Sequence, residues 1–146
     1  MHLDIYIPHE SQLGMRLRLR VEALANHVDR EIAPPWLLLT VEAHAVTKLA
    51  DLLDRSHSEK GAKDAREILA LLKEGVDADL ALRILAEATA GEVVAIPGYV
   101  EEMFKLISRL AKPGKDDQKL LAQWRRKWVQ AAIPYGAQTD ITVRRL

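Results

Sequence analysis

The chain has 146 residues, 49% of them hydrophobic, which is enough for a single domain with its own hydrophobic core. Its 21 Lys and Arg residues balance 21 Asp and Glu residues, so no overall charge would recruit nucleic acid or a membrane surface. Because there is no cysteine and no apolar run near the roughly 20 residues of a membrane span, we expect a soluble, cytoplasmic protein without disulfides.

The first 40 residues predict a small β region of about three or four short strands. Residues 2–8 alternate between apolar and polar side chains and end at a proline, which predicts a strand with Asp4 on the face opposite the core. Residues 16–21 alternate in the same way, although residues 21–25 fit one turn of helix. The stretch 27–40 has two prolines at its centre and predicts an irregular hairpin.

From residue 41 to residue 132 the sequence predicts about five helices. Thr40 and Asp77 are favourable N-cap residues, and Gly75 comes shortly after Lys73, a pairing of cation and glycine that is common at a helix end. The second and third helices are expected to form an antiparallel hairpin. The expected helices cover about 41–55, 60–74, 78–90, 99–111 and 116–132. The side chains expected to face inward from the last one are Leu120, Leu121, Trp124, Trp128 and Val129.

The last residues, 139–146, alternate again and are rich in β-branched side chains. We expect this tail to join the N-terminal sheet or to pair with another subunit. The fold class is therefore α+β and mostly α, in one domain covering residues 1–146. Its parts are a β-rich segment (1–40), a helical segment (41–132) and a β-prone tail (133–146).

Two consecutive helices carry cations and carboxylates close together. Lys48 and Arg55 are seven residues apart, so they point nearly the same way and present two basic groups on one helix face. Lys60, Lys63 and Asp64 lie in the first turn of the next helix, where backbone N–H groups lack intrahelical partners and the helix dipole is positive. This arrangement predicts a binding site for a phosphate group.

Four segments in order, residues 2–8, 37–43, 48–55 and 60–64, resemble the later part of AbiEii-like nucleotidyltransferases. These proteins are of the abortive-infection toxin type and belong to the DNA-polymerase-β-like superfamily. In that family a strand bearing a single Asp supplies the third metal-binding carboxylate. A helix with the pattern Lys…Ala…Arg follows, and a Lys-Asp-x-x-Asp-Ile segment opens the next helix.

The resemblance implies a role for each matching residue. Asp4 matches the third carboxylate, which would make it a catalytic residue and a ligand of Mg²⁺. Lys48 and Arg55 match the helix motif, and Lys63 and Asp64 match the last motif. Together with Lys60, these four residues are the predicted nucleotide-binding set.

The sequence departs from the family pattern in two places. The Gly-Ser turn and the paired Asp-x-Asp that precede the strand of Asp4 in the family are absent, and Glu67 stands where the family usually has Asp. Phosphoryl and nucleotidyl transfer relies on divalent cations held by several carboxylates. The resemblance, which covers residues 1 to about 73, therefore implies a truncated nucleotidyltransferase-like protein without independent catalysis.

Two other classes of function remain open from the sequence. The first is a non-catalytic interaction module, or an antitoxin-like protein, that meets an acidic partner and forms a homo-oligomer through its tail. The second is an RNA-binding helical domain that uses residues 124–127, although the zero net charge disfavours nucleic acid as a partner. No motif of a hydrolase or of a glycine-rich phosphate loop occurs in the chain.

Overall fold

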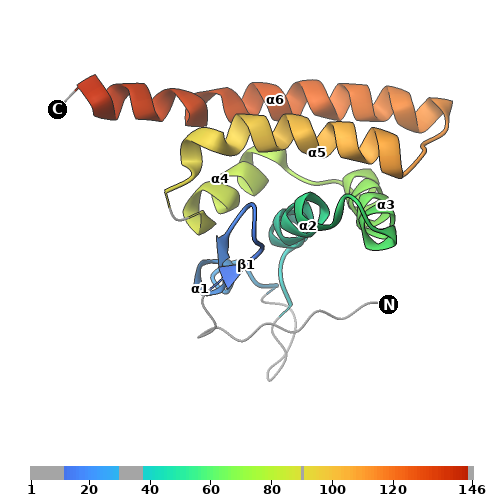
Figure 1. The fold of residues 1–146 in the computed structure, drawn as a ribbon, viewed down its shortest axis with the longest axis horizontal. Helices are drawn as coiled ribbons and strands as arrows, with labels where there is room; N and C mark the ends of the chain where they lie inside the picture. The colour runs from blue at the N-terminus through green and yellow to red at the C-terminus, as the bar shows by residue number, and fades with distance from the viewer. Residues whose placement is uncertain (1–11, 30–37, 90, 145–146) are drawn as a thin grey trace.

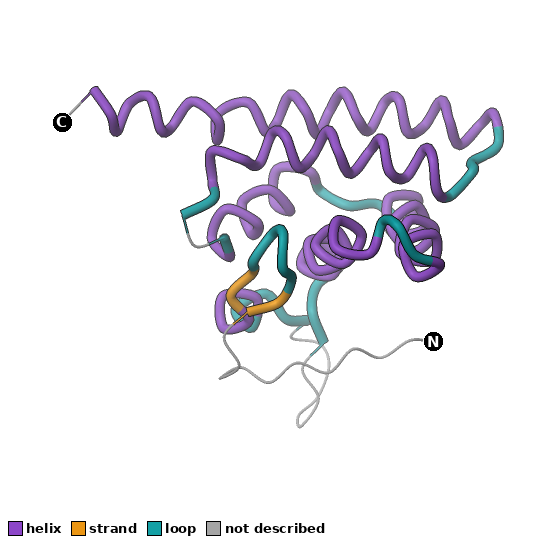
Figure 2. Tube along the Cα trace, in the orientation of Figure 1, coloured by secondary structure: helices purple, strands orange, loops and turns teal. Residues whose placement is uncertain are grey.

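The computed structural model describes residues 12–29, 38–89 and 91–144, with side chains at 14–29, 38–89 and 91–137. Helices dominate the described chain, and one small hairpin supplies its strands (Figure 2). The strands are β1 (Gln12–Leu13) and β2 (Leu19–Arg20). The helices are α1 (Val21–Leu24), α2 (Val41–Arg55), α3 (Glu59–Glu74), α4 (Ala78–Ala88), the 3-10 turn η1 (Val93–Ala95), α5 (Ile96–Leu110) and α6 (Lys115–Arg144). None of the described helices is both long enough and apolar enough to span a bilayer.

Local signals in the sequence place the helix ends correctly. The Thr40 hydroxyl accepts a hydrogen bond from the Ala43 amide at 3.3 Å and caps α2. The Asp77 carboxylate does the same for α4. Gly75 ends α3 with a φ of 107°, in the region that favours glycine. The helix expected from residue 99 instead begins at Ile96, with Pro97 in its first turn, where a proline costs no hydrogen bond.

The helices form two layers, with α5 and α6 antiparallel along the top of Figure 1 and α2, α3 and α4 beneath them. The N-terminal hairpin and α1 lie below α4 and α2. Helix α2 packs against α3, α4 and α5, whereas α3 and α4 have little contact with each other. The predicted antiparallel hairpin of α3 and α4 is therefore wrong. The reason is that α2 has buried positions on most of its circumference and lies between them.

The predicted β region is much smaller than expected in the described part of the chain. Leu17 and Leu19 are fully buried while the arginines between and beside them are exposed, as the alternation predicted. Only the pair of two-residue strands forms a ladder, and the chain then turns directly into α1. A bridge between Val28 and Leu39 joins the two described ends of the stretch predicted as an irregular hairpin, and residues 30–37 between them lie outside the described residues. The strand expected over residues 2–8, with Asp4, lies outside the described residues.

The prediction of a β-prone tail is wrong, because α6 continues through Pro134 to Arg144. Extending an existing helix adds one hydrogen bond for each residue that is fixed, whereas nucleating a new element is costly. The β-branched residues therefore follow the helix that precedes them in spite of their own propensity. Gly136 lets α6 pass close to the start of α5, since a Cβ there would lie 3.2 Å from the Pro97 ring.

The inward face of α6 is partly as predicted. Leu121 and Trp128 are buried, and the Trp128 ring meets Phe104 of α5 edge-on at a centroid distance of 6.1 Å. Leu120, however, is 37% exposed and lies outside the core. Trp128 is therefore a core residue, as its inward position in the sequence predicted.

The turn between β1 and β2 is fixed by polar contacts to two helices. The Asp54 carboxylate on α2 accepts hydrogen bonds from the backbone N–H groups of Met15 and Arg16 at 2.9 and 3.0 Å. The Arg16 guanidinium donates to both carboxylate oxygens of Glu102 on α5, at 2.6 and 2.9 Å. Gly14 starts the turn with a φ of 84°, and a Cβ there would lie 2.3 Å from the Leu17 carbonyl oxygen.

We predict that Glu102 contributes to the pH dependence of stability. The hydrogen bond from Arg16 lowers the pKa of Glu102 below its ordinary value of 4.5, with burial acting in the opposite direction. The carboxylate form is thus favoured in the folded chain, so its stabilising effect is complete above pH 4.5 and is lost as the pH falls through the lower folded pKa. Because the side chain is 36% exposed, we expect Glu102→Gln to cost less than about 1 kcal/mol.

Urea denaturation at several pH values tests this prediction. The difference in free energy of unfolding between the native sequence and Glu102→Gln should be largest near neutral pH and should shrink toward acid. A difference that does not change with pH would show that the pair with Arg16 is not the source of the stabilisation.

Candidate functional site

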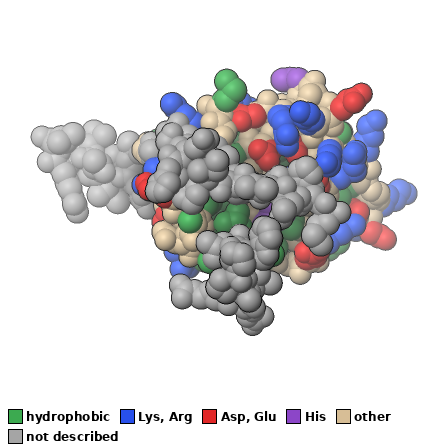
Figure 3. Space-filling model, turned by 90° about the horizontal axis from the view of Figure 1, so that it is seen from below, with side chains coloured by type: hydrophobic (Ala, Val, Ile, Leu, Met, Phe, Trp, Pro, Cys, Tyr) green, Lys and Arg blue, Asp and Glu red, His purple; other side chains and the backbone are tan. Residues whose placement is uncertain are grey.

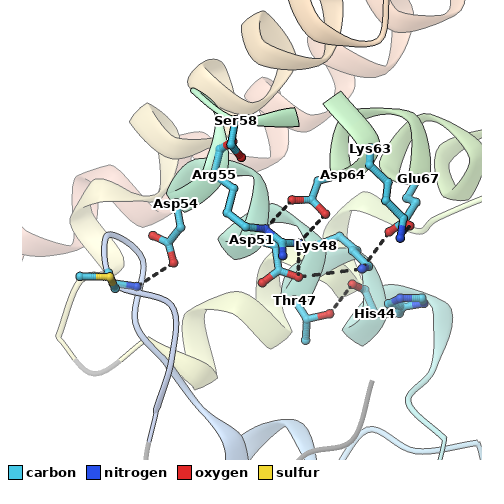
Figure 4. A network of polar contacts seen from close by, with 11 residues as sticks. His44, Thr47, Lys48, Asp51, Asp54, Arg55, Ser58, Lys63, Asp64 and Glu67 are labelled. Atoms are coloured by element: carbon cyan, nitrogen blue, oxygen red, sulfur yellow. Dashed lines mark hydrogen bonds and ion pairs between the residues drawn. The ribbon is translucent and has the colours of Figure 1, made fainter. Parts of the chain in front are cut away.

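Six charged side chains on α2 and α3 form a chain in which positive and negative groups alternate (Figure 4). Three come from each helix. Three of the six are cations and three are carboxylates, so the formal charges cancel. In order along the contacts, this charge network consists of Lys63, Glu67, Lys48, Asp51, Arg55 and Asp64. It includes four of the five predicted nucleotide-binding residues and brings the two predicted motifs together.

Lys48 lies inside this network and not on an open basic face. The residue is only 4% exposed, and its ammonium nitrogen is 2.8 Å from a carboxylate oxygen of Glu67 and 3.9 Å from one of Asp51. A buried ammonium needs such partners, since removing a lone charge from water is expensive. The expectation that Lys48 and Arg55 present two free basic groups is therefore corrected for Lys48, which is held by carboxylates on both helices.

Arg55 and Asp64 form the tightest contact in the network. The Nε and Nη2 groups of Arg55 donate to the two carboxylate oxygens of Asp64 at 2.9 and 2.6 Å. Asp64 is only 1% exposed, whereas the Arg55 side chain is 37% exposed. Burial alone would lower the pKa of Arg55, but the hydrogen bond to Asp64 and the neighbouring carboxylates outweigh it, so the pKa is raised.

A close approach between the end of α2 and the start of α3 makes this contact possible. The Ser58 amide and hydroxyl both donate to the Arg55 carbonyl, at 3.0 and 2.9 Å, and form a tight turn between the helices. A Cβ on Gly61 would lie 2.3 Å from that same carbonyl oxygen, so only glycine fits there without a shift. The turn places Asp64, one helical turn further along α3, directly opposite Arg55.

Two cations stand at the exposed edge of the network. The Lys63 side chain is 55% exposed, and its ammonium nitrogen is 3.9 Å from Glu67. Lys60, the fifth predicted nucleotide-binding residue, is exposed in the first turn of α3. Lys60, Lys63 and the exposed part of Arg55 are the cations in and beside the network that a dissolved anion can reach.

The described residues do not fit a metal site. In the part of the chain that the structure describes, no three His, Cys, Asp or Glu side chains are grouped so that they could hold an ion. The three carboxylates of the network each face at least one cation. Asp4, the predicted Mg²⁺ ligand and catalytic residue, lies outside the described residues.

Sequence reasoning missed Asp51 and Glu67 as members of the site. Asp51 follows Lys48 by three residues and precedes Arg55 by four, which are the spacings of charge pairs on one helix face, so a signal was present. Glu67 was noted as a departure from the family pattern and not as the partner of a buried lysine. Its contact with Lys48 joins two helices, and no local spacing indicates such a contact.

Comparisons with protein-family models, with curated proteins and with solved structures find no match to this chain. The resemblance to AbiEii-like nucleotidyltransferases therefore remains a prediction that depends on the motifs alone.

We predict that replacing Arg55 lowers the free energy of unfolding much more than replacing Asp64 does. Arg55→Leu leaves a buried carboxylate without its main partner and should lower the free energy of unfolding by about 3–5 kcal/mol. Asp64→Asn leaves an arginine that solvent can still reach, so its cost should be smaller.

Chemical denaturation of the two single variants and of Arg55→Leu combined with Asp64→Asn measures this asymmetry. The double variant should be more stable than the sum of the single effects implies, because neither charge is left without its partner. The contrary result is that the two single variants lower the free energy of unfolding equally, with the double variant lowering it by their sum. That result would contradict the view that the burial of Asp64 dominates this contact.

Proposed function

We propose that this chain is a nucleotidyltransferase-like module that binds the phosphates of a nucleotide at the exposed edge of the charge network and does not catalyse transfer on its own. The observation that carries the proposal is the state of Arg55, whose guanidinium is fixed by Asp64 while the side chain is still 37% exposed. A cation held in one orientation binds an anion at a smaller entropic cost than a freely moving one.

The predicted residues divide into two roles in this proposal. Arg55, Lys60 and Lys63 are exposed and are the side chains that would contact phosphate oxygens. Lys48 and Asp64 are buried, so they would act as positioning residues that hold α2 and α3 together. Viewed from below, blue Lys and Arg side chains gather toward the right-hand end of the molecule, where α3 lies (Figure 3).

The proposal assigns binding, and not independent catalysis, to this part of the chain. The three carboxylates of the network are engaged with its cations, and the paired Asp-x-Asp that precedes the strand of Asp4 in the family is absent from this sequence. Mg²⁺ therefore enters the proposal only as the ion that accompanies a nucleoside triphosphate and that the resemblance assigns to Asp4.

We predict that titration with ATP, CTP, GTP and UTP, each with and without Mg²⁺, detects saturable binding of at least one of them. Lys60→Ala combined with Lys63→Ala should weaken this binding by about tenfold or more, since a tenfold change is worth only 1.4 kcal/mol and two charge-assisted contacts are removed. Both side chains are exposed, so the variant should keep the thermal stability of the native sequence.

Lys119→Ala is the matched control, since it removes an exposed lysine on α6 outside the charge network. It should leave the affinity unchanged. If no nucleotide binds, or if the control weakens binding as much as the double variant does, the charge network is not a phosphate site.

A further inference from the structure

The positive charges of this neutral chain are concentrated near its C-terminal end. Residues 103–137 contain eight Lys and Arg residues and two Asp residues, a net charge of +6, so the other residues together carry −6. This part of the chain belongs to α5, α6 and the turn between them. All eight cations are exposed, and they are Lys105, Arg109, Lys112, Lys115, Lys119, Arg125, Arg126 and Lys127. A charge asymmetry of this kind is typical of proteins that bind polyanions.

Most of these cations form no ion pair with a carboxylate among the described residues. The one ion pair that the structure shows for any of the eight joins Arg125 to Glu101 at 3.3 Å. Of the two aspartates, Asp117 contacts Lys73 at 2.8 Å, and Asp116 is exposed. The positive charge of this region is therefore not neutralised within the part of the chain that the structure describes.

Three of the cations form a row along the outer side of α6. Lys115, Lys119 and Arg126 are separated by four and seven residues, which places them on one face of the helix. Leu121 and Trp128 are buried and lie on the opposite face, toward the core. Because each helical residue advances the chain by about 1.5 Å, the row extends over about 16 Å.

A second row of cations runs along α5 on the same side of the antiparallel pair of helices (Figure 1). Lys105 and Arg109 are one turn apart and both are exposed. Lys105 lines an open groove between the two helices together with Ile133, which follows Arg126 by seven residues and so lies on the same face of α6. The groove thus places both rows on one side of the molecule. We call Lys105, Arg109, Lys115, Lys119 and Arg126 the basic face.

The basic face suits a partner that is recognised by its charge. Protein interfaces depend on apolar and aromatic anchors, but the exposed large apolar residues of the described part of α6 lie off this face (Leu120) or beyond its last cation (Ile133). Proteins that bind single strands stack bases on aromatic side chains, whereas Trp124 and Trp128 pack against or within the core. A membrane-binding helix needs a free apolar face, and that face of α6 is packed on α5.

We propose that the basic face binds the phosphates of a DNA duplex without reading its sequence. Packed helices have axes about 8–10 Å apart, so the two rows of long side chains can reach phosphates on both edges of a major groove about 12 Å wide. Each phosphate contact releases counterions, which supplies affinity that does not depend on sequence. A mononucleotide is too small to span both rows, so its binding at the charge network is independent of this face. The proposal therefore does not rest on the proposed function.

Fluorescence anisotropy with a labelled DNA duplex, repeated over a series of salt concentrations, tests this proposal. Lys105→Gln combined with Arg126→Gln removes one cation from each row and should weaken binding by about tenfold or more at low salt. The slope of log affinity against log salt concentration should fall by about 1.8, since each phosphate contact contributes about 0.9. Arg18→Gln combined with Arg83→Gln is the matched control. It removes the same charge from exposed positions on the N-terminal hairpin and α4, and should leave the slope unchanged.

Other anionic probes test the assignment to a DNA duplex. A DNA single strand and polyglutamate lack two rows of phosphates, and an RNA duplex has a narrow major groove, so all three should bind less tightly than the DNA duplex. The absence of duplex binding at low salt, or a slope that the double variant does not change, would overturn the proposal. So would equal or tighter binding of any of the other three probes. Circular dichroism checks that each variant remains folded.

Discussion

The hydrogen-bonded pair of Arg55 and Asp64 is the contact on which the candidate site depends. Asp64 is buried, so its carboxylate requires a partner inside the protein, and Arg55 provides that partner with two donors. Forming the pair requires the start of α3 to approach the end of α2 closely, which Gly61 permits. The same approach sets the register in which Lys48 meets Glu67, so one contact places the whole charge network.

Helix α2 connects this site to the rest of the molecule. Two consecutive residues near its end contact different parts of the chain. Asp54 accepts hydrogen bonds from the backbone of the β1–β2 turn, and Arg55 donates to Asp64 of α3. The apolar side chains of α2 meanwhile pack among α3, α4 and α5. A helix with neighbours on so many sides has little freedom to shift. The exposed cations at the edge of the charge network therefore stand on a rigid support, as a binding site needs.

The sequence was sufficient to predict the features that local interactions determine. Thr40, Asp77 and Gly75 mark helix ends by capping and backbone conformation, and those ends are confirmed. Features that depend on distant contacts were not predictable in this way. The burial of Lys48 requires Glu67 from another helix, and the helical tail results from the helix before it and not from its own β-branched residues. The two helices that carry the motifs of the resemblance do pack against each other, but the resemblance did not predict the pairing of charges between them.

The most direct test of this account is a double-mutant cycle on Lys48 and Glu67, made with Lys48→Met and Glu67→Gln and measured by chemical denaturation. The account predicts a coupling of about 1–3 kcal/mol, because the buried ammonium relies on that carboxylate. The exposed pair of Arg125 and Glu101, at 3.3 Å, is the matched control and should couple by less than about 0.5 kcal/mol. A coupling between Lys48 and Glu67 as small as that of the exposed pair would contradict the claim that the charge network holds α2 and α3 together.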